Sequence, residues 1–321
     1  SFNIGTSWVK IGSTVSKTVT HNADGTKTIS LKGFFDSLGL TSKLDDLTVS
    51  GNVTLKTIPR ASSISSISGS TIGSPVTVNI SREVSSFTHK VYYSFGETKD
   101  YLLGSSVGTS LTFTPSMNDC KYIPNSTKGT AAIRVDTYNG STKIGSTRKN
   151  FTLNVPASVV PTFSKIEFTP AASDVPADWG IYVRTKSKVI VRITGAAGTY
   201  GSTIKSYSIS GGGYSGTGSS LTTGFLNTAG TVTFTAKITD SRGRTTTKTA
   251  SITVTDYAPP VLSGVIGFRC DAEGIEQDDG NYISLTANFS GSVLDRKNPV
   301  TGEYRYKDEG GDWSGFSPLV S

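Results

Sequence analysis

The chain has 321 residues, a formal net charge of +7, 35 glycines, one methionine and only 17% charged residues. This composition favours short strands and turns over long helices, and the length suits two complete domains with partial ones beside them. Lysine and arginine are scattered singly instead of forming a basic stripe, and no apolar run approaches about 18 residues, which argues against a nucleic-acid-binding or membrane-spanning protein.

The first 57 residues look like the closing part of a β domain. A turn at Asn22–Gly25 lies between alternating Val15/Val19 and Ile29/Leu31, and Phe34–Leu47 is the only segment that suits a short helix. The chain begins with Ser1 and a strand-like pattern follows by Trp8, so we expect that the first residue is not the true start.

A repeat of about one hundred residues begins next. Proline-led entries occur at Pro59, Pro161 and Pro260, at intervals of 102 and 99 residues, which is the length of one immunoglobulin-like sandwich. Within each interval, apolar residues alternate with polar ones, as expected for strands with one face in a core. The alternating sets are Val76/Val78/Ile80 and Val91/Tyr93/Phe95 in the first interval, and Val189/Val191/Ile193 and Val232/Phe234/Ala236/Ile238 in the second.

Each complete interval closes with an antiparallel hairpin. The turns contain Asn139–Gly140 and Arg242–Gly243, in which glycine tolerates a positive φ. A third copy starts near Pro259, with alternation at Ile266/Phe268/Cys270 and Ile283/Leu285/Ala287/Phe289, and we expect it to be incomplete.

The predicted fold is therefore all-β, with tandem immunoglobulin-like or fibronectin-like sandwiches in an elongated array joined by short proline-containing linkers. We expect residues 1–57 to be the C-terminal part of a preceding β domain, 58–156 and 157–256 to be complete sandwiches, and 257–321 to be the start of a third. Cys120 and Cys270 lie in different modules, so a disulfide within one domain is not expected.

The sequence offers little for catalysis or cofactor binding, and we predict neither an enzyme nor a cofactor. His21 and His89 are the only histidines, and we interpret them as solvent-facing or packed at turns. Asp45–Asp46 and Asp278–Asp279 are adjacent pairs whose side chains diverge in an extended chain, which does not suit glycan hydrolysis. Gly211, Gly213 and Gly216 follow a strand, but no helix follows them, so a loop is predicted instead of a dinucleotide site.

Two weak ligand sites remain as candidates. The acidic stretch containing Asp271, Asp278 and Asp279 offers carboxylate oxygens for calcium, although it lacks the EF-hand register and is more simply a hairpin turn. Exposed aromatic rings bind saccharides, and Tyr214, inside the glycine-rich loop, and Trp179 are the candidates for such a contact.

Several short segments resemble one known family. They are Thr57–Ser62, Ile123–Ser126, Thr137–Gly140, Val155–Pro161 and His21–Thr26. They are similar to minor structural, tail-associated proteins of siphoviruses that infect streptococci and related Gram-positive bacteria. The resemblance covers essentially the whole chain and implies a virion location, in the phage tail and extracellular on release, without defining catalytic residues.

We therefore expect a non-enzymatic virion structural protein of the tail, tail tip or fibre, whose modules act as a spacer and a host-surface attachment element. Expected partners are other phage tail proteins and host cell-wall polysaccharide, with a homo-oligomer left open and no nucleic acid or membrane. The alternatives are a bacterial surface adhesin stalk and an accessory array of a wall-degrading enzyme.

Overall fold

The computed structural model describes residues 2–4, 7–9, 28–33, 49–54 and 60–319. The predicted turn at Asn22–Gly25, the helix at Phe34–Leu47, the pair Asp45–Asp46, His21 and Pro59 lie outside these residues. The described chain forms two compact units, one of residues 1–122 and 127–156 and one of residues 123–126 and 157–321. The sequence-based domain boundaries remain predictions.

The N-terminal strands of the first unit form two antiparallel pairs. β1 (Phe2–Ile4) pairs with β2 (Ser7–Val9), and β3 (Thr28–Gly33) pairs with β4 (Val49–Thr54). β3 contains the predicted strand residues Ile29 and Leu31.

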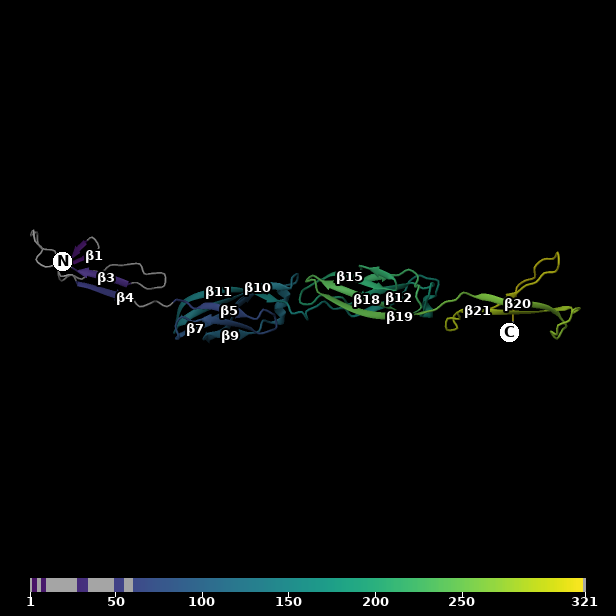
Figure 1. Cartoon of the computed structure of the whole chain (residues 1–321), viewed down its shortest axis with the longest axis horizontal. Coiled ribbons are helices and arrows are strands. Elements are labelled where there is room, and N and C mark those ends of the chain that lie inside the picture. Colours follow the sequence, from purple (N-terminus) through teal and green to yellow (C-terminus); the bar gives the residue numbers. More distant parts are fainter. Residues whose placement is uncertain (1, 5–6, 10–27, 34–48, 55–59, 320–321) are drawn as a thin grey trace, which may run out of the picture. The chain divides into compact units, whose positions relative to one another are not determined.

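The first sandwich consists of two antiparallel sheets in the first unit (Figure 1). The smaller sheet has the order β5-β6-β9, with β5 (Ser63–Ser68), β6 (Val76–Ser81) and β9 (Ser110–Phe113). The larger has the order β11-β10-β7-β8, with β7 (Phe87–Phe95), β8 (Thr98–Val107), β10 (Lys128–Asn139) and β11 (Thr142–Asn154). A short 3-10 helix, η1 (Met117–Tyr122), precedes β10.

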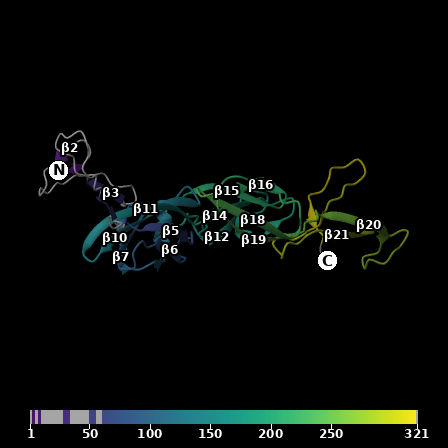
Figure 2. The same ribbon diagram turned by 60° about the vertical axis from the view of Figure 1, so that its left-hand side comes forward.

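The second sandwich repeats this plan in the second unit (Figure 2). Its smaller sheet has the order β12-β14-β17, with β12 (Lys165–Pro170), β14 (Val189–Thr194) and β17 (Ser220–Thr222). Its larger sheet has the order β13-β19-β18-β15-β16, with β13 (Tyr182–Val183), β15 (Ile204–Gly211), β16 (Tyr214–Gly216), β18 (Gly230–Asp240) and β19 (Thr245–Thr255). A 3-10 turn, η2 (Ala177–Trp179), lies before β13.

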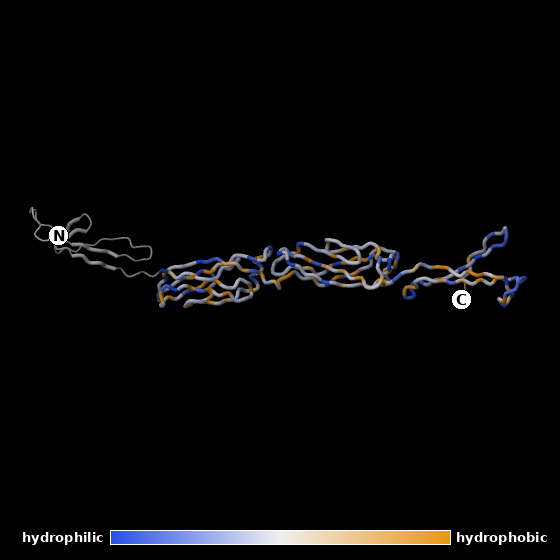
Figure 3. The backbone as a smooth tube through the Cα atoms, viewed as in Figure 1, coloured by the Kyte–Doolittle hydropathy of each residue, from blue (hydrophilic) through white to orange (hydrophobic). Residues whose placement is uncertain are grey.

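The predicted alternation places one face of each strand in a core. Val76, Val78, Val91, Ile133 and Val135 are fully buried in the first sandwich, and a single cluster around Val191, Ile209, Phe234 and Ile238 fills the second. Along these strands, apolar and polar positions alternate in colour (Figure 3). The all-β sandwich prediction is therefore confirmed, and hydrophobic burial is the main source of stability for each sandwich.

The same clasp joins the last strand of each sandwich to its first strand region. In the first sandwich, Thr147 donates its hydroxyl to Ser62 O, and Lys149 Nζ donates to Ile64 O and Ser65 O. In the second, Thr246 donates to Pro161 O, and Lys248 Nζ donates to Phe163 O and Ser164 O. We call this arrangement the Thr-x-Lys clasp. Because the two copies are 99 residues apart, they fix which residues of the sandwiches are equivalent.

The residues after the second sandwich form isolated strand pairs. β20 (Val261–Cys270) pairs with β21 (Tyr282–Ser290), and β22 (Glu303–Tyr304) pairs with β23 (Ser317–Pro318). Beyond a register shift in β20, Ile266 lies opposite Thr286 and Gly267 lies opposite Leu285. Antiparallel partners share a face, so the two predicted apolar sets point to opposite faces of this pair. Both faces are open to solvent, since Ile283 is 77% exposed and Ile266 is 60% exposed.

Candidate functional site

The outer face of the sheet β11-β10-β7-β8 carries a connected set of charged, polar and aromatic side chains. Its central row consists of Tyr92, Arg134 and Arg148, which are direct cross-strand neighbours on β7, β10 and β11. The next row consists of Lys90, Asp136 and Ser146. Residues between these positions, such as Val91 and Val135, are buried, so the strand period places both rows on the solvent side.

Arg134 is held in place from three directions on this face. Its guanidinium lies 4.0 Å from the centre of the Tyr92 ring, and its Nη1 donates to both carboxylate oxygens of Asp136 at 2.6 Å. Its Nε forms an ion pair with Asp100 Oδ1 at 3.3 Å. Contacts with two carboxylates and an aromatic ring together give the guanidinium a fixed orientation.

Asp136 is the anionic centre of the same face. Burial alone would raise its pKa, but hydrogen bonds from Lys143, Ser146 and Arg134 outweigh burial, so the pKa of Asp136 lies below its ordinary value. Asp136 is therefore ionised at neutral pH, and it holds two cationic side chains beside it.

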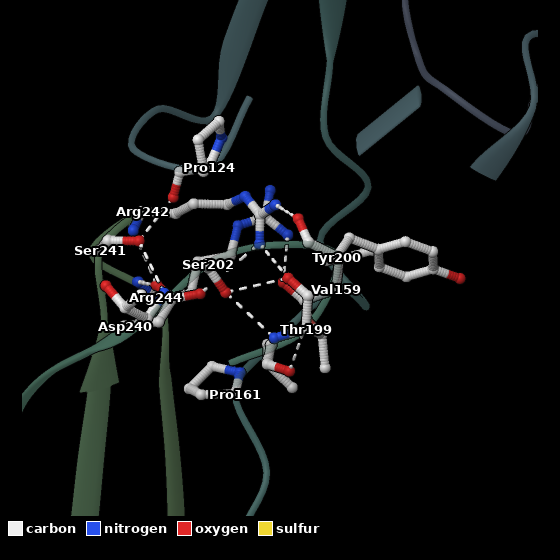
Figure 4. Close-up of polar contacts among 12 residues, drawn as sticks. Pro124, Val159, Pro161, Thr199, Tyr200, Ser202, Asp240, Ser241, Arg242 and Arg244 are labelled. Carbon is white, nitrogen blue, oxygen red and sulfur yellow. Dashed lines mark hydrogen bonds and ion pairs between the residues drawn. The ribbon is translucent and has the colours of Figure 1, made fainter. Parts of the chain in front are cut away.

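A second polar cluster surrounds Arg242 in the turn between β18 and β19 (Figure 4). The guanidinium is buried and donates to three main-chain carbonyls, Ile123 O, Thr199 O and Tyr200 O, each at 2.7 Å. Asp240 Oδ1 accepts from the backbone N–H of Arg242 and of Arg244, which fixes the turn. Segment 123–126 belongs to the same compact unit as this turn, and Ser241 also donates to Pro124 O.

One atom of this cluster is not satisfied. Asp240 Oδ2 is buried without a hydrogen-bond partner and lies 3.9 Å from Arg242 Nη1, which is close enough for an ion pair and too long for a hydrogen bond. Because its guanidinium donates to carbonyls of two segments that are far apart in sequence, Arg242 acts as a structural fastener of the second unit.

His89 forms the third cluster, and of its two interpretations the solvent-facing one was wrong, whereas the ring does pack against the turn between β8 and β9. It is fully buried, with Nδ1 at 2.9 Å from Val107 O and 2.7 Å from Gly108 O. Because carbonyls only accept, Nδ1 carries the proton and Nε2 accepts from Ser62 Oγ at 2.9 Å. This serine–histidine pair resembles a nucleophile and its base, but Ser62 is also fully buried and no substrate reaches it.

A buried tyrosine–carboxylate pair ties η1 to the first sandwich. Tyr93 donates its hydroxyl to Asp119 Oδ2 at 2.9 Å. Burial raises the pKa of Asp119 despite the opposing hydrogen bond and the nearby Lys121, and burial together with the Asp119 charge raises the pKa of Tyr93. Cys120, the residue after Asp119, and Cys270 are both buried.

The sequence-predicted saccharide candidates lie on separate elements of the second unit. Tyr214 is half-buried on β16, and its hydroxyl donates to Phe225 O at 2.7 Å, so the ring is fastened to the next loop. Trp179 is half-buried at the end of η2, and its carbonyl accepts from Lys297 Nζ. Their role in saccharide binding remains a prediction.

The calcium candidates lie in the turn region between β20 and β21. Asp271 Oδ1 accepts from the backbone N–H groups of Glu273 and Ile275, and Oδ2 accepts from Gln277 Nε2. Asp278 and Asp279 are exposed in the following turn. In the part of the chain that the structure describes, no three His, Cys, Asp or Glu side chains gather as metal ligands. Gly211, Gly213 and Gly216 lie on or beside the β15–β16 hairpin, which contains no helix.

Sequence reasoning missed the outer-face residues, the Arg242 cluster and the His89 pair. For His89 a signal was present, because it shares the period of Phe87, Val91 and Tyr93, all of them buried. For Arg134 and Arg148, only the strand register brings the two side chains together.

Comparison with known proteins identifies one family. A family model described as "Siphovirus protein of unknown function (DUF859)" matches residues 7–272, and no curated protein matches the chain. Within the described ranges, no helix is long and apolar enough to cross a membrane.

Solved structures with similar folds include three of different origin. Fibronectin(III)-like modules of Clostridium thermocellum CbhA share 14% identity, with 60% of this chain and 92% of that chain covered and a TM-score of 0.23. Insect hemolin shares 13% identity, with 71% and 56% covered and a TM-score of 0.32. Three N-terminal domains of the bacteriophage RB49 Highly Immunogenic Outer Capsid protein share 12%, with 81% and 80% covered and a TM-score of 0.23.

Proposed function

Because the chain belongs to the DUF859 family of siphovirus proteins, we propose that it is a non-enzymatic component of the phage tail. Its tandem sandwiches space other parts of the particle and help to attach it to the host surface. In this role it contacts other tail proteins and host wall polysaccharide, and it is extracellular once the particle is released.

The observation that carries this proposal is the repeated sandwich. Each copy has its own buried core and its own Thr-x-Lys clasp. Repetition of one closed module extends a protein without adding new chemistry. This design suits a spacer.

The polar clusters support a non-enzymatic role. Ser62 and His89 are buried in the core, and the guanidinium of Arg242 donates its hydrogen bonds to main-chain carbonyls. By contrast, Arg148, at one end of the Tyr92–Arg134–Arg148 row, has a side chain that is 52% exposed, so a partner can reach it. Attachment by weak contacts gains strength when many copies act together on one particle.

Immunolabelling of purified particles tests the location. Antibodies raised against residues 60–256 are expected to label the tail in electron micrographs, and prior absorption with the purified chain should remove the label. Label on the head, or a chain found only in infected-cell lysate and absent from particles, would contradict the tail assignment. Label on uninfected bacteria would favour an adhesin stalk instead.

Cell binding and wall digestion test the two halves of the function. The fluorescently labelled chain is expected to bind host cells saturably, and to release no soluble sugar or peptide from purified walls. Release of wall fragments by the chain alone would overturn the non-enzymatic proposal. Absence of saturable binding would leave only the spacer part of the proposal standing.

A further inference from the structure

We propose that the outer face of the sheet β11-β10-β7-β8 binds a polyol-phosphate chain, an anionic polymer of phosphodiesters and hydroxyl groups. The ligand would lie across Lys90, Arg134 and Arg148. This inference rests on the proposed function and deepens it, because it names the surface and the ligand class for attachment.

The second sandwich shows what this face looks like without such a role. The clasps make Arg148, between Thr147 and Lys149, equivalent to Thr247, between Thr246 and Lys248. Strand pairing then extends the equivalent row from Thr247 to Lys237 and Ser208. The next row, equivalent to Lys90–Asp136–Ser146, consists of Ser206, Thr239 and Thr245. One fold thus has a hydroxyl-covered face in one copy and an arginine-rich face in the other.

The charges on the first face are placed at a cost to stability. Arg134 and Arg148 lie directly opposite each other on neighbouring strands, where like charges are unfavourable. The shared counter-ion Asp100 is close to Arg134 Nε at 3.3 Å, but it is 3.8 Å from Arg148 Nη1. The side chain of Arg148 is 52% exposed, so its guanidinium can pair with an anion from solution.

Lys90 adds a third cation. Its ammonium lies 5.1 Å from the centre of the Tyr138 ring, and the described structure gives it no carboxylate partner. Together Lys90, Arg134, Lys143 and Arg148 exceed the two carboxylates Asp100 and Asp136 on this face. The excess of positive charge selects an anionic ligand.

The aromatic rings argue for a phosphate chain and against a nucleic acid. Binding of single-stranded nucleic acid depends on bases that stack on open rings. Here Arg134 covers the Tyr92 ring and Lys90 lies over the Tyr138 ring, so each ring already holds a cation. The rings orient the cations toward phosphates, and the exposed edge of Asp100 can accept a hydroxyl of the polyol.

The test measures binding of the whole chain to poly(glycerol phosphate) by titration calorimetry at low salt. Neutral dextran serves as the uncharged polymer, and a single-stranded oligodeoxynucleotide as the competing class. Lys90→Ser with Arg148→Thr gives these two positions of the first face the residues found at the equivalent positions of the second. Lys237→Ser is the matched control, since it removes a cation from the equivalent face.

We expect the wild-type chain to bind poly(glycerol phosphate) more tightly than dextran and the oligonucleotide. The double variant should bind about tenfold more weakly, which corresponds to two surface ion pairs, and Lys237→Ser should bind like wild type. The melting temperature of the double variant should equal or slightly exceed that of wild type, because the like-charge pair of Arg134 and Arg148 is removed.

Three results would overturn the inference. The first is that the double variant binds poly(glycerol phosphate) as tightly as wild type, and the second is that Lys237→Ser loses as much affinity as the double variant. The third is that wild type binds dextran or the oligonucleotide at least as tightly as poly(glycerol phosphate), or that it binds none of the three polymers. Immunolabelling of the tail is independent of these results, so a failed ligand leaves the tail assignment intact. Conversely, if the tail were not labelled but the chain still bound poly(glycerol phosphate), the tail assignment would be wrong and the proposed binding surface would stand.

Discussion

The two sandwiches share the order of their common strands and the clasp, although the second has the additional edge strand β13, and they differ where they meet solvent. The central outer row is Tyr92–Arg134–Arg148 in the first and Ser208–Lys237–Thr247 in the second. Their closing turns differ as well, since Asn139 is exposed while the Arg242 side chain is buried among carbonyls. The comparison teaches that burial and main-chain bonding specify this fold, which leaves the outer faces and turns free to acquire separate roles.

The largest expected effect breaks the second sandwich alone. Phe234→Ala removes a fully buried ring from its core and should lower the free energy of unfolding by about 3 to 5 kcal/mol. Calorimetry of the whole chain should show one transition lowered and the other unchanged. Thr233→Ala, on the outward position beside it, is the control. Equal losses in both variants would contradict the assignment of faces.

The next effect tests the difference between the turns. Arg242→Met leaves three carbonyls without their buried donor and should destabilise the second unit by about 3 kcal/mol. Asn139→Ala, at the matching turn of the first sandwich, should change stability by less than about 0.5 kcal/mol. Chemical denaturation measures the free energy of unfolding of both variants. Similar losses in the two would mean that the hydrogen bonds of Arg242 do not stabilise the second unit.

A smaller effect should appear on acidification of the first sandwich. Asp136 has a lowered pKa when folded, so its contribution is present above its unfolded pKa of about 4 and is lost as pH falls through the folded value. We expect a loss of about 1 to 2 kcal/mol between pH 7 and pH 2 in wild type that Asp136→Asn lacks.

Comparing wild type with Asp136→Asn isolates the contribution of Asp136 to the pH dependence of stability. Asp119 has a raised pKa and acts with the opposite sign, becoming favourable as pH falls, but it is present in both proteins and cancels. Thermal unfolding at several pH values measures the difference. If wild type and Asp136→Asn lost the same stability on acidification, the ion pairs of Asp136 would contribute nothing.

The smallest effect concerns what the sandwiches share. Lys149→Met and Lys248→Met each remove a half of one clasp and should each cost about 0.5 to 1.5 kcal/mol in their own sandwich. Denaturation of the two variants in parallel checks this. Losses that differ by more than about 2 kcal/mol would show that the clasps are not equivalent in energy.

Strand period and turn residues were sufficient to predict the cores and the hairpins. The alternation of Val232 to Ile238 predicted which side chains are buried, because the strand period leaves one choice of face once a core exists. His89 obeyed the same period, but its polarity suggested solvent, and only the carbonyls of Val107 and Gly108 with Ser62 explain its burial.

The surface and the turn cluster could not be predicted in the same way. Arg134 and Arg148 meet only through the register of β10 and β11, and Arg242 is satisfied by carbonyls about 40 and 120 residues away in sequence. The local sequence pattern predicts neither the register of these two strands nor the distant carbonyls that bind Arg242. In the last part of the chain, the predicted alternation is present, but the register of β20 and β21 sends its two halves to opposite faces.

The clasp also determines how a sandwich responds to mechanical tension. Its bonds join residues 85 apart, one near the point where the chain enters the sandwich and the other on the last strand, which carries the chain out. A pull on both ends would therefore load the clasp before the core opens. Once the clasp breaks, the enclosed segment of 85 residues can extend to about 290 Å. Each sandwich could therefore lengthen under load and absorb mechanical energy.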